Sequence, residues 1–137
     1  MSITNTVDLI GDEALVARII ERSITDLVDD CTTSLAVYAF GYCTSLTILD
    51  FANVKNIAMY TFANSAVLTT LILRSGTVCA LEAVTAFKGT PFASNGTGGT
   101  VYCPASLITQ YQNATNWSTL YAGGTCNFVA IEGSEYE

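Results

Sequence analysis

Apolar and polar positions repeat along the middle of this chain with a period of 22 residues. Residues 35–51 and 57–73 carry the same pattern, in which aliphatic and aromatic residues recur at matching places. A fixed period in the twenties is typical of a solenoid, in which each repeat buries its apolar face against its neighbours. The pattern predicts two full repeats, at residues 33–54 and 55–76. The matching pairs are Leu35/Ile57, Ala36/Ala58, Tyr38/Tyr60, Phe40/Phe62, Leu46/Leu68, Leu49/Leu71 and Phe51/Leu73.

Each repeat is expected to contain one strand and one turn back. A shorter strand precedes the first full repeat, and a degenerate third repeat follows the second, interrupted by a loop dense in glycine and small polar residues. The expected strands are 23–28, 46–51, 68–73 and 100–103, the turns are 38–42 and 60–64, the third repeat is 77–103 and its loop is 88–99.

Different patterns stand at the two ends of the repeats. Residues 12–22 place acids first and bases last among apolar positions, which suits the dipole of a short amphipathic helix. Such a helix would cover the open end of the first repeat. Pro104 begins a second expected helix at about 105–113, Trp117 is expected to fill the far end of the core, and residues 127–131 form a last strand.

Together these elements predict one domain over residues 1–137, of the α/β class. We expect a short solenoid with a small parallel sheet, a helical cap at the N-terminal end and a helix and strand cap at the C-terminal end. The expected limits are 1–22 for the N-terminal cap, 23–103 for about three repeats, 104–132 for the C-terminal cap and 133–137 for an acidic tail.

The repeat itself resembles a known family. Residues 38–49 read Tyr-Ala-Phe-x-x-Cys-x-Ser-Leu-Thr-x-Leu and residues 53–62 read Asn-Val-x-x-Ile-x-x-Tyr-x-Phe. Both are similar to the BspA-like leucine-rich repeats. Residues 86–91 and 101–104, followed by a tyrosine-containing helix and Asn116-Trp117, resemble the closing repeat of such proteins from gut Firmicutes and their phages.

This resemblance covers about residues 20–132. It implies a leucine-rich-repeat fold, a role in surface recognition or virion assembly, and no catalytic activity. The family usually places glycine where this chain has Ala36 and Ala58. Because glycine adopts positive φ without strain, we expect these turns to be either adjusted or helical here.

The charge of the chain narrows the set of partners. Its net charge is −7 and its pI is near 4.2, and the few basic residues are scattered. Nucleic acids and anionic membranes both need clustered Lys and Arg, so neither is expected as a partner. No apolar run reaches the roughly 18 residues of a membrane span, and the first residues lack the pattern of a signal peptide. We expect assembly in the cytoplasm, release by lysis, and a final place on a virion or an extracellular surface.

Little in the sequence suggests catalysis, a metal or a cofactor. The chain has no histidine, which removes Ser-His-Asp and Cys-His catalysis and the commonest transition-metal ligand. Asp26, Asp29 and Asp30 could offer oxygens to Ca²⁺, but they lack the spacing of a calcium loop, and a solvated acidic loop is the preferred interpretation. Asp50 and Glu82 remain a remote alternative as a hydrolytic carboxylate pair. We expect a protein without enzymatic activity or cofactor.

Cysteines and aromatic residues each allow two interpretations. The number of cysteines is odd and their spacing matches no zinc site, so free buried thiols are preferred, with a Cys103–Cys126 disulfide as the alternative. The four repeated aromatics could form a platform for sugars, but at repeat positions we expect them in the core; they are Tyr38, Phe40, Tyr60 and Phe62.

Two functions follow as hypotheses. The first is a non-catalytic assembly protein that makes protein–protein contacts, as an accessory or decoration component of a bacteriophage virion, either as a homo-oligomer or docked on a larger particle. The second is a recognition module, an adhesin or receptor-binding element, whose strand face binds a host protein or glycan. The residues expected to contact a partner are Thr47, Asp50, Thr69 and Ile72 on the strands, with Tyr42 and Tyr121 as exposed aromatics.

Overall fold

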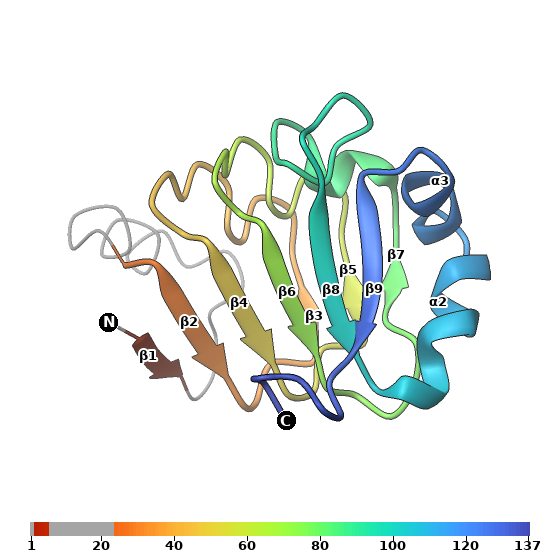
Figure 1. The fold of residues 1–137 in the computed structure, drawn as a ribbon. Coiled ribbons are helices and arrows are strands. Elements are labelled where there is room, and N and C mark those ends of the chain that lie inside the picture. The colour runs from red at the N-terminus through yellow and green to blue at the C-terminus, as the bar shows by residue number, and fades with distance from the viewer. Residues whose placement is uncertain (1, 6–23) are drawn as a thin grey trace.

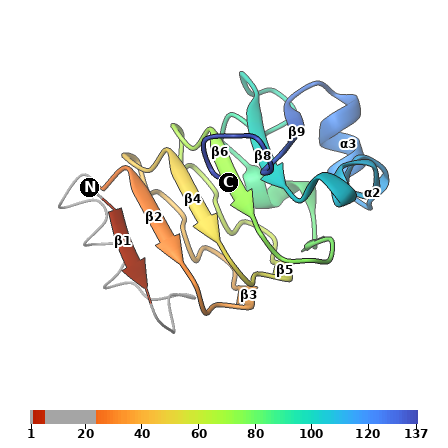
Figure 2. The same ribbon diagram turned by 60° about the horizontal axis from the view of Figure 1, so that its bottom comes forward.

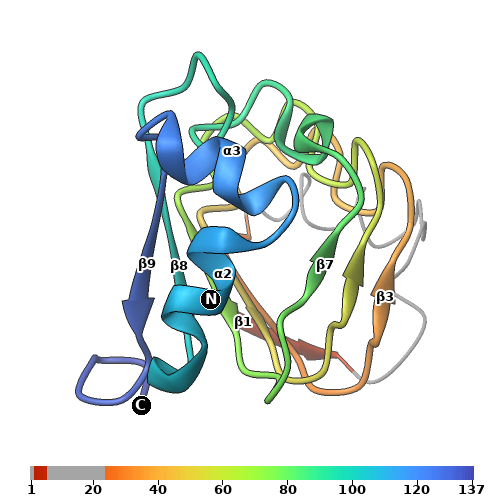
Figure 3. The ribbon, with the colours of Figure 1, turned by 90° about the vertical axis from the view of Figure 1, so that its right-hand side faces the viewer.

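The computed structural model describes residues 2–5 and 24–137. In this part of the chain two parallel sheets face each other across the core, and short helices close one end (Figure 1 and Figure 3). The larger sheet contains β1 (Ser2–Asn5), β2 (Asp26–Asp29), β4 (Ile48–Phe51), β6 (Thr70–Leu73), β8 (Gly99–Cys103) and β9 (Cys126–Ala130). The smaller contains β3 (Ser34–Leu35), β5 (Asn56–Ile57) and β7 (Ala80–Leu81). The helices are the 3₁₀ turns η1 (Val84–Phe87) and η2 (Ala105–Leu107), and α2 (Ile108–Asn113) and α3 (Trp117–Ala122).

The strands of the larger sheet lie side by side in chain order, and every described pair is parallel. Asp26 pairs with Ile48 and Ile48 pairs with Thr70, so two successive steps across the sheet take 22 residues each. The next step, from Thr70 to Thr100, takes 30 residues because the glycine-rich loop lies between them. The predicted α/β class with a parallel sheet is confirmed.

The smaller sheet was not predicted. Its three strands have two residues each, too short to show an alternating pattern. Leu35, Ile57 and Leu81 occupy the same register position and turn inward, and all three are buried. Each of the coils that begin with β2, β4 and β6 therefore contributes one strand to each sheet, on opposite sides of the core.

Side chains of successive coils stack in columns inside the molecule. The inner face of the larger sheet aligns Leu27, Leu49, Leu71, Val101 and Phe128, all at most 8% exposed. A second column consists of stacked rings: the centroids of Phe40 and Phe62 are 6.2 Å apart, and those of Phe62 and Phe87 are 5.2 Å apart. Burying one such side chain stabilises the fold by about 1.5–3 kcal/mol, so the columns explain the repeated apolar positions.

The repeated aromatics divide between the core and the surface, which corrects one expectation. Phe40 and Phe62 are fully buried, as predicted, but Tyr38 is 50% exposed. Tyr38 and Tyr60 stack on each other outside the core, with ring centroids 5.7 Å apart. The reason is local: both have positive φ (60° and 58°), which places the ring on the other side of the turn. The left-handed positions of these turns are thus Tyr38, Tyr42, Tyr60 and Asn64, and not Ala36 and Ala58.

Helices α2 and α3 close one end of the core, between β9 of the larger sheet and β7 of the smaller sheet (Figure 3). Trp117 and Tyr111 are fully buried there, as is expected for a plug. Their polar atoms bond the backbone of the last coil: Trp117 Nε1 donates to Cys79 O at 2.7 Å, and Cys79 N donates to Tyr111 Oη at 2.9 Å. Asn116 Nδ2 donates to Leu81 O at 2.7 Å. Side chains therefore make the hydrogen bonds that a further strand would have made.

The predicted helix at 105–113 is confirmed in position, though it begins as the 3₁₀ turn η2. The second helix, α3, was not predicted, because its six residues are too few for a clear period. The expected helix at 12–22 lies outside the described residues. Among the helices that the structure describes, none is long and apolar enough to span a bilayer.

Candidate functional site

The outer face of the larger sheet is the surface on which the sequence placed its partner contacts. Parallel register arranges its outward side chains in two rows that cross the strands. The first row contains Asp26, Ile48, Thr70, Thr100 and Asn127, and the second contains Val28, Asp50, Ile72, Tyr102 and Val129. The first row is mainly polar, whereas the second has an apolar centre.

Three of the four strand residues expected to contact a partner are accessible. Thr69 is exposed, and Thr47 and Asp50 are half-buried. The hydroxyl of Thr47 is already engaged, because it donates to Thr25 O at 3.1 Å. Ile72 is fully buried, so its expected role as a surface contact is wrong in this conformation.

The C-terminal segment, residues 131–137, explains the burial of Ile72. It turns back after β9 and crosses the outer face in front of β6 (Figure 1 and Figure 2). The ring of Tyr136 meets the ring of Tyr102 edge-on, with centroids 4.7 Å apart. Glu132 Oε1 accepts a hydrogen bond from Ala105 N at 3.0 Å at the start of the segment. The predicted acidic tail is therefore docked on the strand face.

Charges surround this docked segment. Arg74 forms a bidentate pair with Asp50, with Nε to Oδ1 at 2.7 Å and a terminal nitrogen to Oδ2 at 2.8 Å. Burial raises the pKa of the Tyr136 phenol, and the carboxylates of Glu135, Asp26 and Asp50 raise that pKa further. The tyrosine of the tail thus sits against an acidic part of the face.

The face also has a part with a neutral lining, in the region of the first row. A cavity of about 410 Å³ opens at the first residues of β6, β8 and β9, and hydroxyls, amides and glycine backbone line it. Gly99 has to be glycine here, because a Cβ would lie 2.5 Å from the ring of Phe92. The lining residues are Thr69, Thr70, Thr97, Gly98, Gly99, Thr100, Gly124 and Asn127. This lining can exchange hydrogen bonds with a neutral polar ligand.

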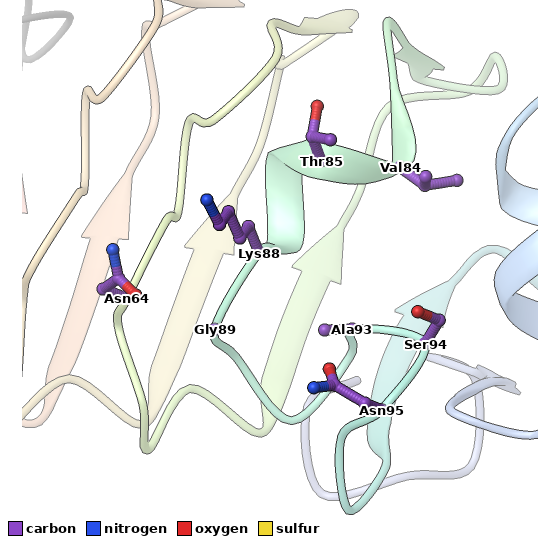
Figure 4. A pocket seen from close by; sticks show the side chains of 8 residues that line it. All are labelled: Asn64, Val84, Thr85, Lys88, Gly89, Ala93, Ser94 and Asn95. Carbon is purple, nitrogen blue, oxygen red and sulfur yellow. The ribbon is translucent and has the colours of Figure 1, made fainter.

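A second cavity, of about 320 Å³, lies on the turn side of the third coil (Figure 4). Asn64 and Lys88 border one side, and Ser94 and Asn95 border the other. The ammonium of Lys88 stands 5.9 Å from the centroid of the Tyr60 ring, a cation–π distance. Lys88 continues the stack of exposed rings that Tyr38 and Tyr60 begin.

The two exposed tyrosines of the prediction are accessible but stand apart from the strand face. Tyr42 is 57% exposed and lies in the turn after β3, with φ of 58°. Tyr121 is 40% exposed on α3, where its ring lies 6.0 Å from that of Phe128. The six expected contacts therefore do not form a single site.

Thiol chemistry is suppressed at four of the five cysteines. All five, which lie in the described part of the chain, are free, and Cys43, Cys79, Cys103 and Cys126 are buried while Cys31 is exposed. Burial raises the pKa of Cys43, Cys79 and Cys126 to about 12 and that of Cys103 to about 11. The alternative Cys103–Cys126 disulfide is wrong, because the register pairs Cys126 with Gly99 and Cys103 with Ala130, at opposite ends of their strands.

The acidic residues that the sequence analysis considered do not come together as a ligand cluster or as a facing pair in the described residues. Asp29 is buried, which corrects the expected solvated loop: its Oδ1 accepts from Cys31 N and Thr32 N, both at 2.8 Å. Asp50 is bound to Arg74 on the larger sheet, whereas Glu82 directly follows β7 of the smaller sheet, so the two do not face each other. Over residues 24–137 no group of three or more potential metal ligands comes together.

Known proteins offer no guide to this arrangement. Comparisons with protein families, with curated proteins and with solved structures each find no match to the chain.

Proposed function

We propose that this chain is a short leucine-rich-repeat solenoid of the BspA-like kind, and that it makes non-catalytic protein–protein contacts. The fold proposal is supported by the 22-residue steps of the larger sheet and by the columns of leucine and phenylalanine that accompany them. Closure of the last coil by Trp117 and Tyr111 supports a C-terminal cap, since repeat proteins need their open ends covered.

One observation carries the proposed function. The second row of the outer face has an apolar centre, Ile72 and Tyr102, beside the charged pair Asp50 and Arg74, and the chain's own terminal segment is docked there. An apolar centre with a charged rim is the usual anatomy of a protein interface. This face therefore has the composition of a surface that takes up a polypeptide segment.

The context that we propose is an accessory or decoration component of a bacteriophage virion, as the family resemblance implies. A face of only a few short strands offers less than the roughly 800 Å² per partner of a standard interface. Display of many copies on one particle would compensate for weak single contacts. Placement on a virion or an extracellular surface is part of this proposal.

Recognition of a host glycan is the second candidate. It is favoured by the neutral cavity of about 410 Å³ beside Thr69 and Thr100, whose hydroxyls suit sugar hydroxyl groups. Replacing Thr69 and Thr100 by valine would abolish such binding and leave assembly intact.

Solution mass tests the assembly proposal. We expect light scattering to give a defined oligomer at every concentration above its dissociation constant, unchanged by reductant because the described cysteines form no disulfide. A chain that stays monomeric at all concentrations would contradict self-assembly and favour the recognition module.

A further inference from the structure

The chain's own terminal segment reports what kind of polypeptide the outer face accepts. Tyr136 inserts an aromatic ring against Tyr102, over a row whose centre is Ile72. Ile72 points outward from a sheet that has its core on the other side, yet it is fully buried. The face therefore contains a binding position for one aromatic side chain.

The charges of the residues next to Tyr136 are poorly suited to this binding position. Glu135 and Glu137 flank Tyr136, and Asp26 and Asp50 belong to the two outward rows of the same face. Both aspartates contribute to the raised pKa of the Tyr136 phenol. Within residues 24–137 neither glutamate forms an ion pair, and Arg74, which directly follows β6, is already bound by Asp50. Acidic residues thus surround an acidic segment, and the aromatic contact is opposed by repulsion between like charges.

A segment of opposite charge would remove this conflict. Lysine or arginine on both sides of an aromatic residue would place cations beside Asp26 and Asp30, neither of which forms an ion pair within the described residues. Asp30 is exposed, and its carboxylate lies close enough to contribute to the raised pKa of Arg74. The acidic rim is therefore available to a basic segment.

We infer that residues 132–137 occupy the binding site of a partner and are displaced when the partner binds. The partner docks on the outer face through an aromatic side chain flanked by basic residues. This inference rests on the proposed protein-binding function and names the chemistry of the partner. In the docked complex the partner's ring takes the place of Tyr136, and its cations face Asp26 and Asp30.

Three short peptides test the inference on the full chain. The probe is acetyl-Gly-Ser-Lys-Tyr-Lys-amide, the tail sequence with both flanking glutamates changed to lysine. One control is the native acetyl-Gly-Ser-Glu-Tyr-Glu-amide, and the other is acetyl-Gly-Ser-Lys-Ala-Lys-amide. Binding is followed by NMR through the methyl signals of Ile72, in the Tyr136→Ala variant and in the unmodified chain.

We expect the lysine–tyrosine–lysine peptide to bind the Tyr136→Ala variant about tenfold more tightly than the native tail peptide, and to lose this advantage in high salt. The lysine–alanine–lysine peptide should bind weakly, because it lacks the ring. The unmodified chain should show the same order at lower affinity, since its own tail competes. Adding Asp26→Asn and Asp30→Asn should bring the two tyrosine peptides to equal affinity.

Equal binding of the two tyrosine peptides before that change would overturn the inference. So would the absence of any Ile72 shift at millimolar peptide, or shifts confined to other surfaces. If the chain still forms its oligomer while no peptide binds, the proposed assembly function stands and only the inference fails. Peptide binding by a chain that stays monomeric would leave the inference intact and contradict assembly with itself.

Discussion

The regular coils, residues 24–76, and the closing region, residues 104–131, solve the same problem with different side chains. In the regular coils, backbone groups of one coil bond the next coil, and a small hydroxyl fills the gap: Ser65 Oγ donates to Phe40 O at 2.6 Å and accepts from Cys43 N at 3.0 Å. In the closing region no next coil exists. There, Tyr111, Asn116 and Trp117 bond the backbone of the last coil.

The difference teaches what periodicity can and cannot encode. In the regular coils the neighbouring coil supplies most of the packing, and at Ser65 a small side chain completes the hydrogen bonds. The closing region has to fill the whole end of the core, so large aromatic side chains from two short helices converge there. Its stability should therefore depend on a few residues, whereas that of the coils is shared among many.

The largest effect should come from Trp117→Ala. The variant removes a fully buried ring that touches Phe87, Tyr111 and Phe128, and it leaves Cys79 O without its donor. We expect the free energy of unfolding to fall by about 3–5 kcal/mol, measured by chemical denaturation. Thr119→Ala, an exposed change on the same helix, is the matched control and should change it by less than about 0.5 kcal/mol. Similar losses for both variants would contradict a closing role for Trp117.

A smaller effect is expected in the regular coils, from Ser65→Ala. Two hydrogen bonds between neighbouring coils are lost, and buried groups at Phe40 O and Cys43 N are left without this partner. The expected loss is about 1–3 kcal/mol in the same denaturation experiment. Ser94→Ala, exposed in the loop of the third coil, should be nearly neutral. A Ser65 variant as stable as the Ser94 variant would mean that coil-to-coil bonding contributes little.

The sequence predicted the parallel strands of residues 24–76 well and the structure of residues 104–131 only in part. Leu49 and Leu71, or Phe40 and Phe62, repeat at one spacing, so a single pattern identified both the strands and the core. Trp117 was expected to fill the end of the core, but α3 was missed, since six residues carry too little periodicity.

The candidate site was predicted less well than the fold. Thr47 and Thr69 lie directly before β4 and β6, outside the alternation of these strands. Alternation placed Asp50 and Ile72 on the outer face, and this direction is correct for Ile72. Its burial comes from residues 131–137, far along the chain, and contact between distant segments leaves no local signal. The expected core position of Tyr38 was wrong for a different, local reason: positive φ at Tyr38 and Tyr60 redirects the rings, and no residue type announces it.

A still smaller effect should follow from Tyr136→Ala, at the junction between the strand face and the terminal segment. The ring contact with Tyr102 is lost, and Ile72 becomes accessible to solvent. We expect a loss of about 0.5–1.5 kcal/mol in the free energy of unfolding, with faster hydrogen exchange confined to β6 and β8. Glu137→Gln serves as the control and should leave both quantities unchanged or slightly raise stability. Exchange that accelerates throughout the coils would show that the segment is part of the core structure.

The last prediction involves no expected change in stability. The reactivity of the cysteines tests whether the regular coils and the closing region open together. At neutral pH a thiol reagent should label one of the five cysteines in the folded protein, Cys31, and Cys31→Ser should remove that reaction. The other four are buried, and a pKa raised to about 11 or 12 keeps them protonated, whereas the thiolate is the reactive form. Their labelling therefore requires opening of the structure.

Cys43 reports the regular coils and Cys126 the closing region, and both belong to one continuous apolar cluster. We expect mass spectrometry in mild denaturant to find the two labelled at the same rate, because a shared core unfolds as a unit. Faster labelling of Cys126 would mean that the aromatic closure opens separately, and the coils would then be the more stable half of the molecule.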